Sequence, residues 1–248
     1  MAGPYAHVPI GQAIKSSFLW AAAVARRHPE GLVATMLAVL VLSIIPVVGP
    51  LLAAISIIPL IMVTHNEVIR GPAGFDSTAL GPGWRRVLRF FLDEMVLGLI
   101  LMGVYLVPVL VVILLAAALD TKENPLVALV LSIPLMGVAA FVMVGTMRLT
   151  LRFPSRSIDA ALRWREAWAI GRGHTFRLIV ASSVIGLPVM VLWGAITLAT
   201  LGSLFGQWLF LGLVAPLQVV LHSSFLALAY MHCMTDFQNR RQEPASAR

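Results

Sequence analysis

The chain of 248 residues is 59% hydrophobic and only 12% charged, and it carries a formal net charge of +7. Soluble domains average about 25% charged residues, so this composition excludes an ordinary soluble domain and predicts a membrane protein. The apolar segments are continuous, whereas the strands of a membrane barrel alternate in segments of about ten residues. We therefore expect an all-α polytopic fold.

Six apolar segments approach or exceed the ~20 residues that a helix needs to cross ~30 Å of hydrocarbon. We predict six transmembrane helices in one membrane domain, residues 1–236, followed by a disordered cytoplasmic tail, residues 237–248. The predicted spans are about 31–48, 51–69, 95–118, 126–147, 178–200 and 208–232.

The basic residues indicate how these helices are oriented. With the amino terminus in the cytoplasm, 17 of the 18 Lys and Arg residues fall on the cytoplasmic side, and only Lys122 falls outside. Such a bias is the positive-inside pattern of membrane proteins. The sequence therefore predicts that both termini are cytoplasmic.

Three segments flanking the spans are typical of amphipathic helices that lie in the headgroup layer. They are residues 10–27, 84–94 and 157–170. Pro29 marks the entry to the first span, and Gly49 with Pro50 predicts a tight turn after it. Ser157 is the expected N-cap of the third amphipathic helix.

A weak internal repeat relates the even-numbered spans. The segment PLLAAISIIPLIMV from Pro50 and the segment PLVALVLSIPLMGV from Pro125 share a nine-residue spacing between prolines. In the sixth span, Pro216 aligns with Pro59 and His222 aligns with His65. This pattern predicts three hairpin pseudo-repeats, each built from two proline-containing spans and a preceding interfacial helix.

The segment from Arg148 to Arg177, the connector between the fourth and fifth spans, holds seven of the sixteen arginines. Its recognisable residues are Arg148, Phe153, Pro154, Asp159, Trp164, Arg165, Glu166, Ala167, Trp168, Gly173, Arg177 and Leu178. This pattern resembles the loop of uncharacterised bacterial six-span membrane proteins, which are similar to the membrane domain of glycerophosphoryl diester phosphodiesterases. The resemblance implies a bacterial inner-membrane protein. It transfers no catalytic residue, because the phosphodiesterase chemistry of that family belongs to a separate soluble domain.

An intramembrane polar site is the first candidate for function. Its residues are His222, His65, Glu67 and Arg148. An ionisable group at membrane depth indicates a proton relay or a ligand contact, although a neutral histidine bonded to a neighbouring helix is an alternative. Asp93 and Glu94 lie in a comparable layer of the third span.

Two further interpretations involve these polar residues. Glu67 can form a buried ion pair with Arg148, or it can bind a metal together with His65 and His232. No span carries ligands at the i, i+4 spacing of a known metal site, so we expect neither a metal nor another cofactor.

A basic cytoplasmic surface is the second candidate site. Its residues are Arg152, Arg156, Arg163, Arg165, Arg172 and Arg177. A cationic residue near an anionic membrane surface contributes ~1 kcal/mol of binding energy, so these arginines are candidates for binding anionic lipid headgroups or a membrane-protein partner. The alternative is that they serve membrane topology alone.

The sequence contains no glycine-rich phosphate loop, nucleophile elbow, cysteine cluster or nucleic-acid module, so we expect neither an enzyme nor a nucleic-acid partner. The leading prediction is a non-enzymatic membrane scaffold, or a lipid-binding or partner-binding protein, with a basic cytoplasmic face. One alternative is a small-solute transporter or channel that uses His222 and His65. A second alternative is an enzyme that acts on lipid phosphates at the layer of arginines and histidines.

Overall fold

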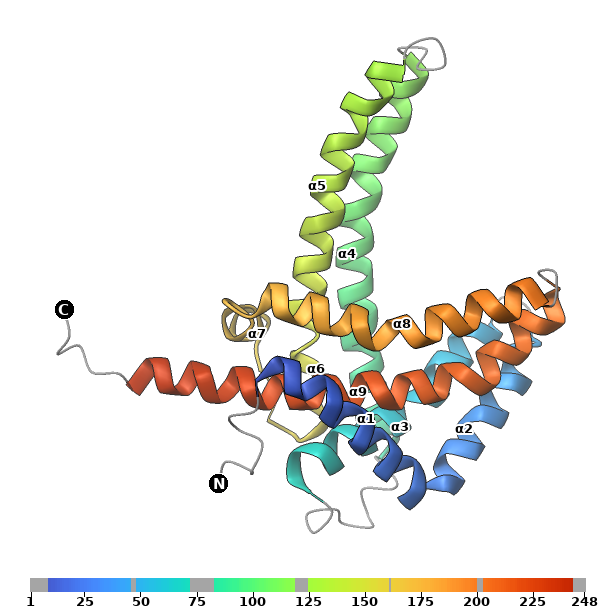
Figure 1. Cartoon of the computed structure of the whole chain (residues 1–248), viewed down its shortest axis with the longest axis vertical. Helices are drawn as coiled ribbons and strands as arrows, with labels where there is room; N and C mark the ends of the chain where they lie inside the picture. Colours follow the sequence, from blue (N-terminus) through green and yellow to red (C-terminus); the bar gives the residue numbers. More distant parts are fainter. Residues whose placement is uncertain are drawn as a thin grey trace.

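The computed structural model describes residues 9–45, 48–71, 83–118, 125–160, 162–199 and 203–242. This part of the chain folds into nine α-helices and contains no β-strand, which confirms the all-α class (Figure 1). The helices are α1 (Ile10–Arg27), α2 (Pro29–Leu42), α3 (Gly49–Arg70), α4 (Trp84–Ala118), α5 (Pro125–Leu149), α6 (Arg152–Ser157), α7 (Trp164–Ile170), α8 (Thr175–Ala199) and α9 (Leu204–Gln242).

Five stretches of the described chain are long and apolar enough to cross a membrane, which indicates a multi-pass membrane protein. They are Gly49–Arg70, Trp84–Leu115, Ile133–Ser157, Thr175–Ala199 and Gly206–Arg240. They correspond to five of the six predicted spans.

The first predicted span, residues 31–48, is not confirmed. Helix α2 has 14 residues, which rise about 21 Å, less than the ~30 Å of a hydrocarbon core. It ends before Ser43, whose hydroxyl donates to the carbonyl of Leu40 at 3.0 Å and leads the chain into a turn. Residues 46 and 47, just before the end of the predicted span, lie outside the described residues.

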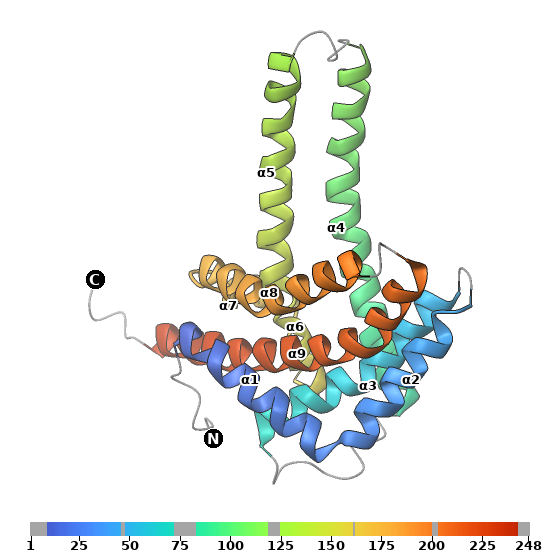
Figure 2. The ribbon, with the colours of Figure 1, turned by 45° about the vertical axis from the view of Figure 1, so that its right-hand side comes forward.

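The long helices form three hairpins, α2–α3, α4–α5 and α8–α9, but these do not form one parallel bundle. The α4–α5 hairpin stands away from the rest of the molecule, and α8 and α9 run crosswise to it (Figures 1 and 2). Helix α9 packs against α1, α2, α3 and α8. The three-repeat packing predicted from the sequence is therefore not confirmed, although each hairpin is present.

Helix α1 has the bounds expected for the first amphipathic segment and packs along α9. Its buried face carries Ala13, Ser17 and Val24. Nearby, the short distance between α2 and α9 depends on Gly212, because a Cβ there would overlap the side chain of Leu40.

The second amphipathic segment, residues 84–94, is not a separate helix. It is the first part of α4, which continues without interruption through 35 residues. No glycine or proline occurs between residue 84 and Gly98, so nothing in the local sequence stops the helix at the predicted boundary.

The third amphipathic segment, residues 157–170, is not one helix either. Ser157 is the last residue of α6 rather than an N-cap, and its hydroxyl donates to the carbonyl of Phe153 at 3.1 Å. Asp159 then has a φ of 61°, which breaks the helical path. Helix α7 begins five residues later, where the Glu166 carboxylate accepts a hydrogen bond from the backbone N–H of Arg163 at 2.8 Å.

The carboxyl-terminal helix also differs from the prediction. Helix α9 continues through Gln242, so the tail predicted from residue 237 begins inside this helix. The remaining residues of that tail, 243–248, lie outside the described residues.

Each hairpin has a tip, where its two helices are connected, and an opposite end. We call the three opposite ends, together with α1, α6 and α7, the base. The charged residues of the described chain lie in this base. Ion pairs connect its elements: Arg27 with Glu67, Arg86 with Asp159, Arg152 and Arg156 with Asp93, and His174 and Arg240 with Asp236. The base is therefore held by paired charges as well as by apolar packing.

Candidate functional site

A cavity of about 320 Å³ lies between α3, α4, α6 and α9. It brings together His65 of α3 and His222 of α9, which the internal repeat aligns. Its wall is formed by Ile61, His65, Phe90, Glu94, Thr150, Phe153, Gln218, Val219, His222, Ser223 and Leu226. We call it the histidine cavity.

Regular helix spacing places the polar side chains on this wall. Residues four apart lie on the same face of a helix, and three such pairs line the cavity. They are Ile61 with His65 on α3, Phe90 with Glu94 on α4, and Gln218 with His222 on α9. Each helix thus contributes one apolar or amide residue and one ionisable residue.

His65 is fully buried, and its hydrogen bonds define the state of its ring. Its Nδ1 lies 2.9 Å from the hydroxyl oxygen of Ser157. Because that hydroxyl donates its proton to the carbonyl of Phe153, Nδ1 is the donor, and Nε2 of the neutral ring is an acceptor. Among the described residues, nothing donates a hydrogen bond to this Nε2.

A second unsatisfied acceptor belongs to the same cavity. The side-chain oxygen Oε1 of Gln218 is buried and has no hydrogen-bond partner among the described residues. Buried polar atoms without partners are rare and costly, and water or a ligand usually satisfies them. The histidine cavity can therefore hold a small molecule that donates hydrogen bonds, and the carboxyl group of Glu94 on its wall also suits a donor or a cation.

Glu67 and Arg148 do not join the two histidines. The buried carboxylate of Glu67 forms an ion pair with Arg27 and lies 3.1 Å from Nε2 of His28. Arg148 stacks on Trp168, with its guanidinium carbon 4.7 Å from the ring centre. The proposed Glu67–Arg148 ion pair is therefore absent from the described residues, and each residue connects different elements of the base.

The described residues contain no group of three or more His, Cys, Asp or Glu side chains that could hold a metal ion. The alternative that His65, Glu67 and His232 share a metal therefore has no support in this part of the chain.

The six connector arginines predicted to face lipid divide into two groups. Arg152 and Arg156 both contact Asp93 at 3.1 Å, so they hold α6 against α4. Arg152 also lies 4.2 Å above the ring centre of Trp164. The other four are exposed and form no ion pair with a described carboxylate: Arg163, Arg165, Arg172 and Arg177. We call these four the exposed connector arginines.

Sequence reasoning did not identify several residues of these sites. Gln218 had a detectable signal, because it lies four residues before His222 on the same helix. Arg27 and His28 had none, because their contact with Glu67 joins positions about forty residues apart, which no local pattern predicts.

The fold and its charged base define an all-helical multi-pass membrane protein. No protein-family model, curated protein or solved structure matches this chain.

Proposed function

We propose that the protein is a non-enzymatic scaffold of a bacterial inner membrane, with both termini in the cytoplasm and a basic cytoplasmic face that binds anionic lipid headgroups. The observation that carries this proposal is the exposure of the four connector arginines without carboxylate partners in the described chain. An arginine that serves the fold forms internal contacts, as Arg152 does with Asp93 and Trp164.

The charges of this face have the right location for such a role. The exposed connector arginines lie in the base, on the side of the molecule to which the positive-inside pattern assigns the cytoplasm. Each contributes ~1 kcal/mol of attraction to an anionic surface, and salt screens this attraction beyond a Debye length of about 8 Å at physiological ionic strength. We therefore propose that lipid binding is cumulative and sensitive to salt.

Replacing all four exposed connector arginines by glutamine should lower the enrichment of anionic lipid around the protein by about fivefold or more. The protein would be reconstituted in phosphatidylglycerol and phosphatidylethanolamine, and native mass spectrometry would record the ratio of the two lipids retained. A fourfold Arg→Lys variant is the matched control, because it keeps the charge and should keep the enrichment. Equal enrichment in the glutamine variant would refute the lipid role, and loss of a co-purifying protein instead would indicate a partner-binding face.

A small-solute transporter or channel is the second candidate function, and the histidine cavity is the specific observation that favours it. Two unsatisfied acceptors and a carboxyl group on one wall suit a small molecule with amine or hydroxyl donors. His65 and His222 provide the polar surface that a conducting pathway between α3 and α9 requires.

We expect liposomes containing the protein to take up labelled methylammonium or glycerol faster than empty liposomes, and the variant Gln218→Leu to lose most of this flux. The substitution removes one unsatisfied acceptor and adds apolar volume to the wall. The variant Gln12→Leu, on the exposed side of α1, is the matched control and should retain the flux. Equal uptake by empty and protein-containing liposomes would exclude transport of these two solutes.

A further inference from the structure

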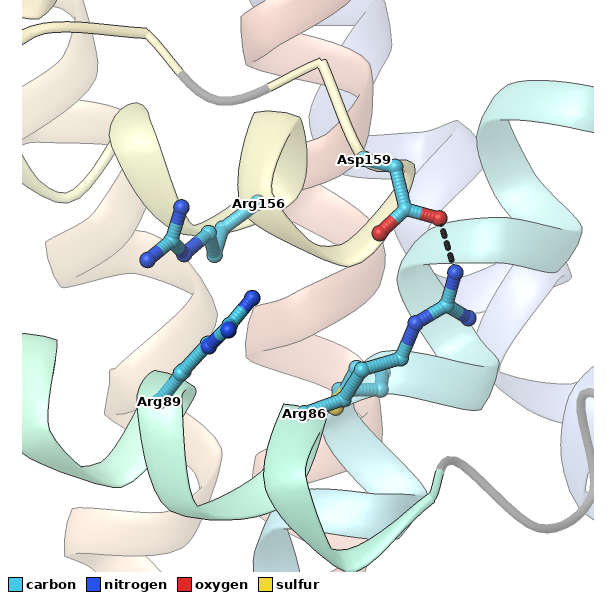
Figure 3. A pocket seen from close by; sticks show the side chains of 5 residues that line it. Arg86, Arg89, Arg156 and Asp159 are labelled. Carbon is cyan, nitrogen blue, oxygen red and sulfur yellow. Dashed lines mark hydrogen bonds and ion pairs between the residues drawn. The ribbon is translucent and has the colours of Figure 1, made fainter.

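A second cavity, of about 210 Å³, lies where the first turns of α4 meet α6. Its wall is formed by Arg86 and Arg89 of α4, Arg156 of α6, Asp159 after α6, and Met62 of α3 (Figure 3). We call it the arginine pocket. It is separate from the histidine cavity, with which it shares no lining residue among those the structure describes.

The guanidinium groups of the arginine pocket are not fully paired. Arg86 forms an ion pair with Asp159. Arg156 uses its Nε for Asp93, at 3.1 Å. Arg89 forms no ion pair or hydrogen bond with any described residue, and Figure 3 shows its guanidinium directed into the pocket, below the side chain of Arg156. An anion between these two groups would replace their repulsion by attraction.

The net charge of the pocket indicates the kind of anion. Three arginines and one aspartate give a net charge of +2. Including Asp93 with its second partner Arg152 leaves this value unchanged, because the two added charges cancel. A phosphomonoester carries a charge close to −2 at neutral pH, whereas a phosphodiester carries −1 and would leave one positive charge uncompensated.

Guanidinium groups also have the geometry that phosphate recognition needs. Their planar fork of N–H donors binds two phosphate oxygens at once, and such charge-assisted bonds are about twice as strong as neutral ones. Arg89 and Arg156 come from different helices, so they can bind different oxygens of a single phosphate. A carboxylate has only two oxygens and is less well matched to three guanidinium groups.

An apolar crevice of about 330 Å³ lies beside the same first turns of α4. It is lined by Ile55, Trp84, Val87, Leu88 and Phe91. One short helical segment thus contributes both to a cationic pocket and to an apolar crevice, which is the arrangement that suits a molecule with a phosphate group and an acyl chain.

We infer that the arginine pocket binds a phosphomonoester group, carried either by a lipid headgroup or by a soluble molecule. The lipid form of this inference rests on the proposed lipid-binding function and gives that function a specific site. Arg89 and Arg156 contact the phosphate oxygens, and Asp159 competes with the phosphate for Arg86.

The test uses the full chain in nanodiscs and in neutral detergent. Native mass spectrometry would compare phosphatidic acid, a phosphomonoester, with phosphatidylglycerol, a phosphodiester with the same acyl chains. We expect phosphatidic acid to bind about tenfold more tightly than phosphatidylglycerol. We expect the variant Arg89→Gln to bind phosphatidic acid about tenfold more weakly than the unchanged protein. Arg89 is exposed and makes no ion pair or hydrogen bond with described residues, so its loss should leave the fold intact.

Two further variants sharpen this test. Arg85→Gln removes a charge from the same helical turn but from outside the pocket, so it should have little effect. Asp159→Asn releases Arg86 and should increase phosphomonoester binding several-fold. The inference would be overturned by equal binding of the two lipids together with no binding of a soluble phosphomonoester, or by equal effects of Arg89→Gln and Arg85→Gln.

Titrations with glycerol 3-phosphate and inorganic phosphate in detergent distinguish the source of the phosphate. Binding of these compounds with loss in Arg89→Gln supports a soluble ligand, and binding of phosphatidic acid alone supports a lipid. The glutamine variant of the exposed connector arginines separates this inference from the proposed function. If the fourfold glutamine variant retains anionic lipid while Arg89→Gln no longer binds the phosphomonoester, the proposed lipid-binding function fails and the inference about the arginine pocket holds. The reverse result overturns only the inference about the arginine pocket.

Discussion

Replacing Glu67 by glutamine is expected to lower the free energy of unfolding by about 3 kcal/mol. The carboxylate is 1% exposed and faces the guanidinium of Arg27 and the ring of His28 at the junction of α1 and α2. Glutamine has almost the same shape but no charge, so the substitution leaves Arg27 without its counter-ion. Arg27 is 45% exposed and can turn toward water, which places the expected cost at the lower end for a buried ion pair.

Equilibrium unfolding of the reconstituted protein in a denaturing detergent would measure this change. The variant Glu30→Gln is the matched control, because Glu30 is exposed in the first turn of α2 and should contribute less than about 1 kcal/mol. Equal unfolding curves for the two variants would show that α1 is held to α3 and α9 by apolar contacts alone.

The hairpins were predictable from the sequence because each depends on local information. Long apolar segments require helices in a membrane, and short polar or glycine-containing links return the chain. The prolines at positions 59, 108, 134, 188 and 216 lie inside helices of these hairpins. The length of the first span was overestimated, because hydropathy measures composition and does not locate the turn that begins at Ser43.

The direction of the α4–α5 hairpin was not predictable, because contacts between distant segments determine it. At the foot of this hairpin, Phe90 of α4 packs on Phe153 of α6, with ring centres 5.2 Å apart. Ile58 and Met62 of α3 belong to the same cluster. A hydropathy profile contains no information about which of many apolar side chains meet.

The candidate site was predictable only in part, for a similar reason. The repeat paired His65 with His222, and the structure places both on one cavity. Glu67 and Arg148 were grouped with the histidines only by their predicted depth in the membrane. That depth does not specify which side of a helix a residue occupies. Glu67 lies two residues from His65, about 200° around α3, and therefore faces the α1–α2 junction.

Replacing Asp93 by asparagine is expected to lower the free energy of unfolding by about 3 kcal/mol, although the residue forms no part of either cavity wall. Its carboxylate is 16% exposed and accepts hydrogen bonds from Arg152, which is 12% exposed. Arg152 is also held by Trp164 and by the carbonyl of Leu162 at 2.8 Å. It therefore cannot readily turn toward water when its counter-ion is lost.

The matched control is Asp159→Asn, which removes the same charge from the ion pair with Arg86. Both partners of that pair are about half exposed, so water can replace the lost interaction and the cost should stay below about 1 kcal/mol. Equilibrium unfolding of both variants and of the double variant measures each cost and their coupling. Equal costs would mean that apolar packing, chiefly of Phe153, holds α6 against α4. A larger cost for Asp93→Asn would mean that the ion pair with Arg152 positions α6, and with it the guanidinium of Arg156 that lines the arginine pocket.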